Sequence, residues 1–212
     1  MNKDITVEEK ELSLREKNTL EQLKTVEPLS IEELNYFKEG IYSLRTRRFG
    51  DVAEIMIRKF YKLERSADLA YDSIDIDSNK VEIKFSTVMK KNGSNINENN
   101  VIKSIFDANS LNRAMNYADL KKETFDCNIQ QIKPVEFDYL YYGLFLGDCV
   151  LIFRMSSQDV LNDPNIGYSN KQHRNNEGEG QFHIKRNNID YHLDTYLEQT
   201  LSYHELYELL SI

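Results

Sequence analysis

Between Tyr71 and Ser86 the chain alternates apolar and polar residues, and this alternation constrains the fold more than any other feature of the sequence. The pattern predicts two short β-strands joined by a turn at Asp77-Ser78-Asn79. Side chains two residues apart share one face of a strand. The polar face of the second strand therefore carries Glu82, Lys84 and Ser86, while its apolar face can pack into a core.

This polar face has the groups needed to hold a divalent metal ion. The preceding strand brings Asp72 close to Glu82 and Lys84. Two carboxylates and a lysine at a sheet edge can hold a cation and a water, which is an arrangement that cleaves phosphodiester bonds. The alternative interpretation is an exposed strand edge with an ordinary cross-strand ion pair.

The length and composition are those of a globular protein. The 212 residues fit one large domain or two small ones, and 40% of them are hydrophobic. The sequence has no apolar run long enough for a transmembrane helix, and its first residues lack the apolar segment of a secretory signal. We therefore expect a cytoplasmic protein. In that compartment Cys127 and Cys149 should be reduced core residues, and their spacing does not suit zinc.

The net charge of −8 counts against nucleic-acid binding, which depends on Lys and Arg meeting phosphates. Binding uses a local patch, however, and not the sum of all charges. Residues 41–95 carry eleven Lys or Arg and eight Asp or Glu, so the surroundings of the predicted strand pair are locally basic. The charge balance therefore makes the hypothesis of a nucleic-acid partner weaker without excluding it.

Periodicity and capping patterns give a coarse order of elements. They predict helices at 6–26, from Ser30 to Gly40, at 48–63, at 101–118 and from Ser202 to Leu210. They predict strands around 69–88, at 129–132, at 137–145 and at 149–155, the last two as a buried hairpin. The fold class is α/β, with a central mixed β-sheet flanked by helices. We expect a single domain over 1–212, with a helical N-terminal extension at 1–40 and a polar loop region at 160–188.

The stretch from Phe49 to Ser86 resembles the PD-(D/E)XK nuclease superfamily, and within it the Type II restriction endonucleases. The pattern shared with that family is a helix with a glutamate, an aspartate on one strand, and Glu-x-Lys on the next. Here these are Glu54, Asp72 and Glu82-Ile83-Lys84. The resemblance implies a restriction-endonuclease-like core. Glu-x-Lys alone is a weak pattern, and the specific signal is the combination.

The resemblance also implies roles for these residues. Asp72 is the first acid, Glu82 the second and Lys84 the lysine, with Glu54 as a supporting glutamate. Mg²⁺ would be held by Asp72, Glu82 and the Ile83 carbonyl, and Lys84 would orient the attacking water or stabilise charge on the phosphate. The proline that names the motif is absent, since Tyr71 precedes Asp72. Asp75 competes with Asp72 for the place of the first acid.

Candidate DNA-binding residues follow the motif and recur near residue 170. Lys90 and Lys91 come directly after the predicted catalytic strand, where they can meet the DNA backbone. Amide and basic side chains can pair with base edges in the major groove. We expect such contacts from Asn170, Lys171, Gln172, His173, Arg174, Asn175, Gln181 and Lys185. A polar surface loop is the alternative interpretation of this second group.

These patterns together predict a Mg²⁺-dependent Type II restriction endonuclease that cuts double-stranded DNA at a short site. A symmetric DNA site with two strands to cut favours a homodimer. Two alternatives stay open. One is another nuclease of the same superfamily, acting in repair or nicking, and the other is an inactive nucleic-acid-binding module on the same fold.

Overall fold

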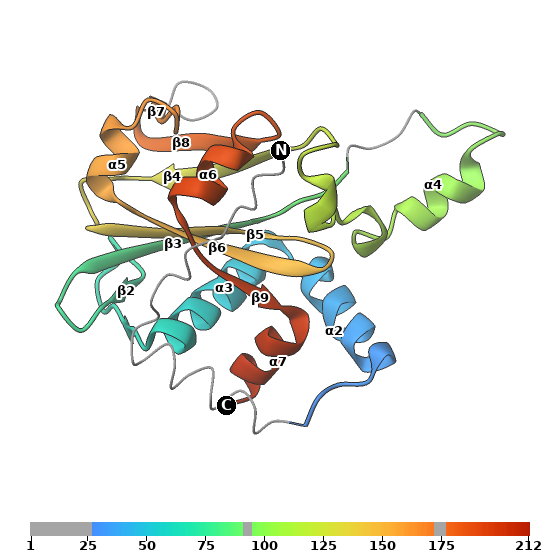
Figure 1. The fold of residues 1–212 in the computed structure, drawn as a ribbon, viewed down its shortest axis with the longest axis horizontal. Coiled ribbons are helices and arrows are strands. Elements are labelled where there is room, and N and C mark those ends of the chain that lie inside the picture. The colour runs from blue at the N-terminus through green and yellow to red at the C-terminus, as the bar shows by residue number, and fades with distance from the viewer. Residues whose placement is uncertain (1–26, 91–94, 172–176) are drawn as a thin grey trace, which may run out of the picture.

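The computed structural model describes residues 27–90, 95–171 and 177–212. In this part of the chain a central six-stranded sheet lies between a layer of helices and a smaller three-stranded sheet (Figure 1). The helices are α2 (Ile31–Ser43), α3 (Thr46–Tyr61), α4 (Val101–Asp107), α5 (Ser157–Asn162), α6 (Ile189–Thr195) and α7 (Tyr203–Ser211), with 3₁₀ turns η1 (Leu111–Arg113) and η2 (Tyr117–Asp119).

The central sheet is mixed, as the sequence predicts. Its strands lie in the order β1 (Glu64–Arg65), β2 (Ser73–Ile74), β3 (Lys80–Thr87), β5 (Tyr139–Phe145), β6 (Cys149–Ser156) and β9 (Leu197–Ser202). β3 and β5 are parallel, and the other neighbouring pairs are antiparallel. The smaller sheet has the order β4 (Asp126–Ile132), β8 (Glu177–Lys185) and β7 (Ser169–Lys171).

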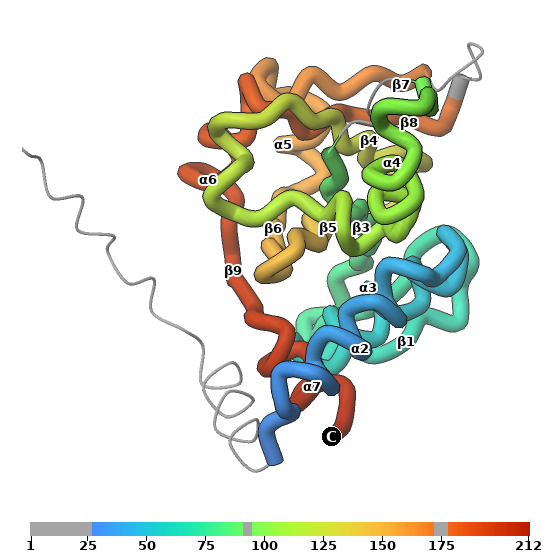
Figure 2. Tube along the Cα trace, turned by 90° about the vertical axis from the view of Figure 1, so that its right-hand side faces the viewer, coloured from blue at the N-terminus to red at the C-terminus, as the bar shows by residue number. Residues whose placement is uncertain are grey.

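Each face of the central sheet packs against a different layer. Helices α2, α3 and α7 cover one face, and β4, β8, α5 and α6 lie over the other (Figure 2). Strand alternation divides β5 between them, because Tyr141 and Phe145 pack with α3 whereas Leu140, Tyr142 and Leu144 pack with the smaller sheet. The polar face of β3 is on the side of the smaller sheet.

Several local predictions are confirmed. Ser30 with Glu33 and Ser202 with Glu205 form capping boxes at the starts of α2 and α7. The predicted helix at 48–63 is α3, whose buried positions repeat with helical spacing. β5 and β6 form the buried hairpin. Both cysteines are free.

Three predictions about element boundaries are wrong. The helix expected to end at Gly40 continues to Ser43, because Gly40 does not adopt the left-handed conformation that ends a helix. The helix expected over 101–118 ends at Asp107, because polar side chains there bond the backbone: Asn109 accepts from the Leu111 N–H, and Asn112 donates to the Phe106 carbonyl. The segment expected as a polar loop at 160–188 contains β7, β8 and the end of α5. The predicted helix at 6–26 lies outside the described residues. Among those described, no helix has the length and apolar character to cross a membrane.

Candidate functional site

Asp72 is fixed to the edge of β3 by two hydrogen bonds. It lies directly before β2, and its N–H donates to the Val81 carbonyl at 3.0 Å. Its carboxylate Oδ2 accepts from the Ile83 N–H at 2.8 Å. The aspartate and the Glu-x-Lys strand are therefore held together by backbone groups of the strand itself, as the predicted strand pair requires.

Glu82 and Lys84 share one face of β3, and both lie beside Asp72. The Lys84 ammonium contacts the Glu82 carboxylate and lies 3.6 Å from Asp72 Oδ2. Glu82 is a buried acid with 8% of its surface exposed, and the side chains of Asp72 and Lys84 are also largely covered. The Lys84 ammonium thus bridges two carboxylates in a largely buried region.

Burial changes the acidity of this cluster. Desolvation raises the pKa of Glu82 to about 7, in spite of the opposing charge of Lys84, and the nearby Asp72 charge adds to the rise. Desolvation acts to lower the pKa of Lys84, but the charges of Glu82 and Asp72 outweigh it, and the pKa is raised. The lysine therefore stays charged at neutral pH, whereas Glu82 is easily neutralised.

The cluster opens into a polar pocket of about 180 Å³ between the two sheets. Asp72, Glu82 and Lys84 form one side. Polar groups of β4, of β8 and of the chain after β4 form the other side, namely Gln131, Lys133, Glu136 and Glu179. Four carboxylates against two ammonium groups make the pocket acidic, so an anionic substrate needs added cations to enter it.

The donor chemistry fits a small divalent ion. Val81 and Ile83 both present their backbone to Asp72, and the N–H and C=O of one strand residue point to the same side. The Ile83 carbonyl therefore faces this edge as well. Among the described residues, no group of three or more His, Cys, Asp or Glu side chains is arranged to hold a metal. Two carboxylates, a carbonyl and waters are nevertheless enough for Mg²⁺, which keeps much of its hydration in proteins.

The structure separates the two other candidate acids from the pocket. The Asp75 carboxylate accepts from the N–H groups of Asp77 and Asn79 and from the Asn79 amide, so it stabilises the turn and does not face Glu82. Glu54, on α3, forms an ion pair with Arg58 at 3.0 Å. It does not line the pocket, although its charge is near enough to raise the pKa of Lys84.

The candidate DNA-binding residues are spread over several elements. Lys91 and the four residues from Gln172 to Asn175 lie outside the described residues. Lys90 is exposed after β3, and Asn170 and Lys171 are exposed on β7. On β8, Gln181 is two residues from the pocket residue Glu179, whereas Lys185 is six residues away, about 20 Å along a strand.

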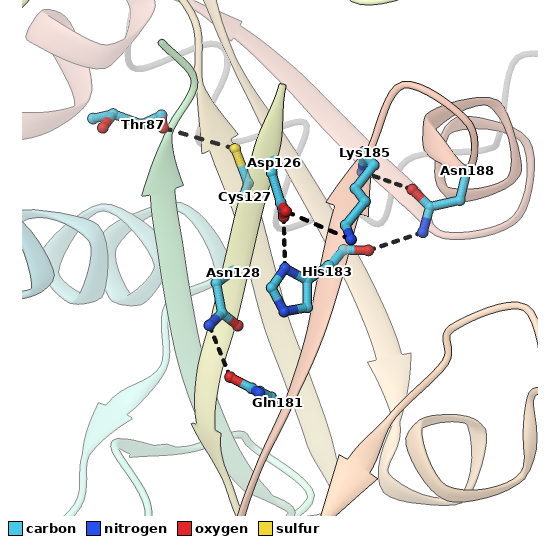
Figure 3. A network of polar contacts seen from close by, with 8 residues as sticks. All are labelled: Thr87, Asp126, Cys127, Asn128, Gln181, His183, Lys185 and Asn188. Atoms are coloured by element: carbon cyan, nitrogen blue, oxygen red, sulfur yellow. Dashed lines mark hydrogen bonds and ion pairs between the residues drawn. The ribbon is translucent and has the colours of Figure 1, made fainter. Parts of the chain in front are cut away.

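Gln181 and Lys185 belong to a second polar cluster, on the outer face of β4 and β8 (Figure 3). His183 Nδ1 and Asp126 Oδ1 lie 2.5 Å apart, and Lys185 Nζ lies 3.5 Å from Asp126 Oδ2. The Asn128 amide donates to Gln181 at 2.8 Å. We call these five residues the outer-face cluster.

Comparison with models of known protein families and with curated proteins finds no match to this chain.

Four polar pocket residues were not predicted from the sequence, namely Gln131, Lys133, Glu136 and Glu179. They come from the smaller sheet and from the segment that leads into β5, and no local spacing relates them to Glu82. An available signal was the alternation of buried Phe182 and Ile184 with polar neighbours, which marks β8 as a strand.

Proposed function

We propose that this protein is a Mg²⁺-dependent nuclease of the PD-(D/E)XK type, and specifically a homodimeric Type II restriction endonuclease. The observation that carries the proposal is the convergence of Asp72, Glu82 and Lys84 in one half-buried pocket. The order of elements supports it, since a helix with Glu54 precedes Asp72, and strand β3 with Glu82 and Lys84 follows. A restriction-endonuclease-like core is part of the same proposal.

Each residue has a distinct task in this mechanism. Asp72, Glu82 and the Ile83 carbonyl would hold Mg²⁺, and a bound ion would supply polarisation of the phosphate and a more acidic water. Asp72 is oriented by the Ile83 N–H, so it is placed before the ion arrives. Lys84, which contacts Glu82 in this structure, would either orient the attacking water or stabilise charge on the phosphoryl oxygens. The smaller sheet covers the pocket and would limit the access of bulk water, which would strengthen the electrostatic interactions of these groups.

The same arrangement explains why the ion would have to bind before or with the DNA. The pocket carries more carboxylates than ammonium groups, so it repels a phosphodiester when no metal is present. Basic and amide groups outside the pocket would then contribute affinity for the DNA backbone and the bases: Lys90, Asn170, Lys171, Gln181, Lys185 and the stretch that includes Arg174.

The test is cleavage of plasmid and long genomic duplex DNA with and without Mg²⁺. Discrete fragments support a restriction enzyme, whereas nicks or a smear point to another nuclease of the superfamily. Lys84→Ala should abolish cutting while DNA binding is retained. The matched control is Lys80→Ala, which removes an exposed lysine from the same face of β3. The proposal fails if the wild type does not cut, or if Lys84→Ala cuts as well as the wild type.

A further inference from the structure

Gln131 has an unusual backbone conformation at the wall of the pocket. Its φ is +62°, in the left-handed region that residues with side chains rarely adopt. Gln130 pairs with Gln181 and Ile132 pairs with Gly180, so Gln131 is an extra residue with no partner on β8. It is the inserted residue of a β-bulge, a device that turns a side chain in a new direction and often lies beside active sites.

The residues around the bulge hold it in place. Ile132 is fully buried, and its carbonyl accepts a hydrogen bond from the Tyr168 hydroxyl at 3.2 Å. Opposite it, Gly180 lies against the Tyr168 ring, and a Cβ there would come within 2.1 Å of the Tyr168 oxygen. The packing of these three residues therefore fixes the strand on both sides of Gln131, which offsets the energy of its strained backbone.

The consequence of the bulge is that Gln131 lies in the pocket. Along β4 the residues before it alternate, with Cys127 and Ile129 buried and Gln130 exposed. Regular alternation would turn Gln131 toward the core and Ile132 away from it. The extra residue buries Ile132 instead and leaves Gln131 in the pocket wall with Glu82 and Lys84.

We propose that the Gln131 amide binds a phosphodiester oxygen of the DNA next to the acidic pair. This inference rests on the proposed function. A primary amide can donate a hydrogen bond to a phosphoryl oxygen without adding charge, and the pocket already has an excess of carboxylates. Gln131 is then a substrate-binding residue supplied by the smaller sheet, across the pocket from the residues of β3. The site is built from two sheets.

The decisive variant is Gln131→Gly, because glycine adopts a positive φ readily and removes only the side chain. We expect its urea unfolding midpoint to equal or exceed that of the wild type, while cleavage of plasmid DNA in Mg²⁺ falls about 10- to 100-fold. Gln131→Asn has a shorter amide side chain, and asparagine tolerates this backbone conformation. Its cutting rate should lie between those of the wild type and Gln131→Gly. The control is Gln130→Ala, which removes the neighbouring exposed amide and should cut like the wild type.

The outcomes separate this inference from the proposed function. If the wild type cuts and Gln131→Gly cuts equally well, Gln131 does not bind substrate, while the nuclease assignment stands. If Gln131→Gly loses activity only together with stability, the role is structural and the inference is overturned. A wild type that neither cuts DNA in Mg²⁺ nor binds it in Ca²⁺ overturns both.

Discussion

The pocket and the outer-face cluster both combine carboxylate and lysine side chains, and they differ in burial. Asp72, Glu82 and Lys84 lie in the pocket between the sheets, and Glu82 is almost fully covered. In the outer-face cluster, Asp126 and Lys185 are nearly half exposed. Burial raises the pKa of Glu82. Burial also acts to raise the pKa of Asp126, but His183 and Lys185 outweigh it and the pKa is lowered. The difference in burial thus leaves the pKa of the acid shifted in opposite directions in the pocket and in the exposed cluster, although each acid has a lysine beside it.

The largest expected difference between the clusters is in cleavage. Loss of even an outer partner of a metal ligand costs about 10- to 100-fold in activity, so Glu82→Gln, which removes a ligand, should reduce the cutting rate at least about 1000-fold. Asp126→Asn should change it by less than about twofold, because neither Asp126 nor its partners His183 and Lys185 line the pocket. Time courses of plasmid cutting at saturating Mg²⁺ measure both. Equal losses in the two variants would contradict the distinction.

The next test concerns β8, which contributes residues to the pocket and to the outer-face cluster. Phe182 is fully buried and packs edge-to-face on Tyr142, with ring centres 5.4 Å apart. Phe182→Ala should lower the free energy of unfolding by about 3–5 kcal/mol. Gln181→Ala, one residue away on the outer face, should lower it by less than about 1 kcal/mol. Urea unfolding of both variants checks this. Similar losses would mean that β8 is not a packed strand.

β8 was not predicted as a strand from the sequence. The pattern Gln181-Phe182-His183-Ile184-Lys185 alternates as a strand should, but the polar residues around it suggested a DNA-reading loop. The strand becomes recognisable once its buried residues are seen against β5 and α6. Local polarity was a poor guide because only one face of the smaller sheet meets a core.

Strand β3 was predictable for the opposite reason. Glu82 and Lys84 share a face by strand alternation alone, and the turn at 77–79 brings Asp72 to them, so all three groups come from one short segment. The competing Asp75 lies just before a turn, where Asp side chains commonly bond the backbone, and it does so here. Gln131 and Glu179 reach the pocket from distant parts of the chain, so no spacing rule relates them to Glu82.

A third prediction uses pH to separate the clusters. The pKa of Glu82 rises in the folded state from an ordinary 4.5 to about 7, so between these values the folded protein binds more protons than the unfolded chain. Without metal, this residue's contribution to stability therefore decreases as pH rises from 4.5 to 7. Mg²⁺ needs the deprotonated carboxylate, so its stabilising effect should grow over the same interval, to about 1–2 kcal/mol when the ion is well above its Kd.

Thermal unfolding at pH 5 and pH 8, with Mg²⁺ and with EDTA, measures this effect. Glu82→Gln should remove most of the Mg²⁺-dependent stabilisation at pH 8, while Asp126→Asn should leave it intact. A Mg²⁺ effect that is the same at both pH values would show that Glu82 is not a ligand.

The smallest effect should come from the outer-face cluster itself. The pKa of Asp126 is below its ordinary value of 3.8, so its contribution to stability is complete above that pH and is lost as pH falls through the lower folded-state value. Because the side chain is nearly half exposed, Asp126→Asn should cost no more than about 0.5 kcal/mol at pH 7. Salt should reduce even this difference, since water and ions screen an exposed pair. Urea unfolding at low salt and at 1 M NaCl tests both points. A larger loss that resists salt would mean that this cluster is shielded from solvent like the pocket, and the contrast between the two sides of the smaller sheet would not hold.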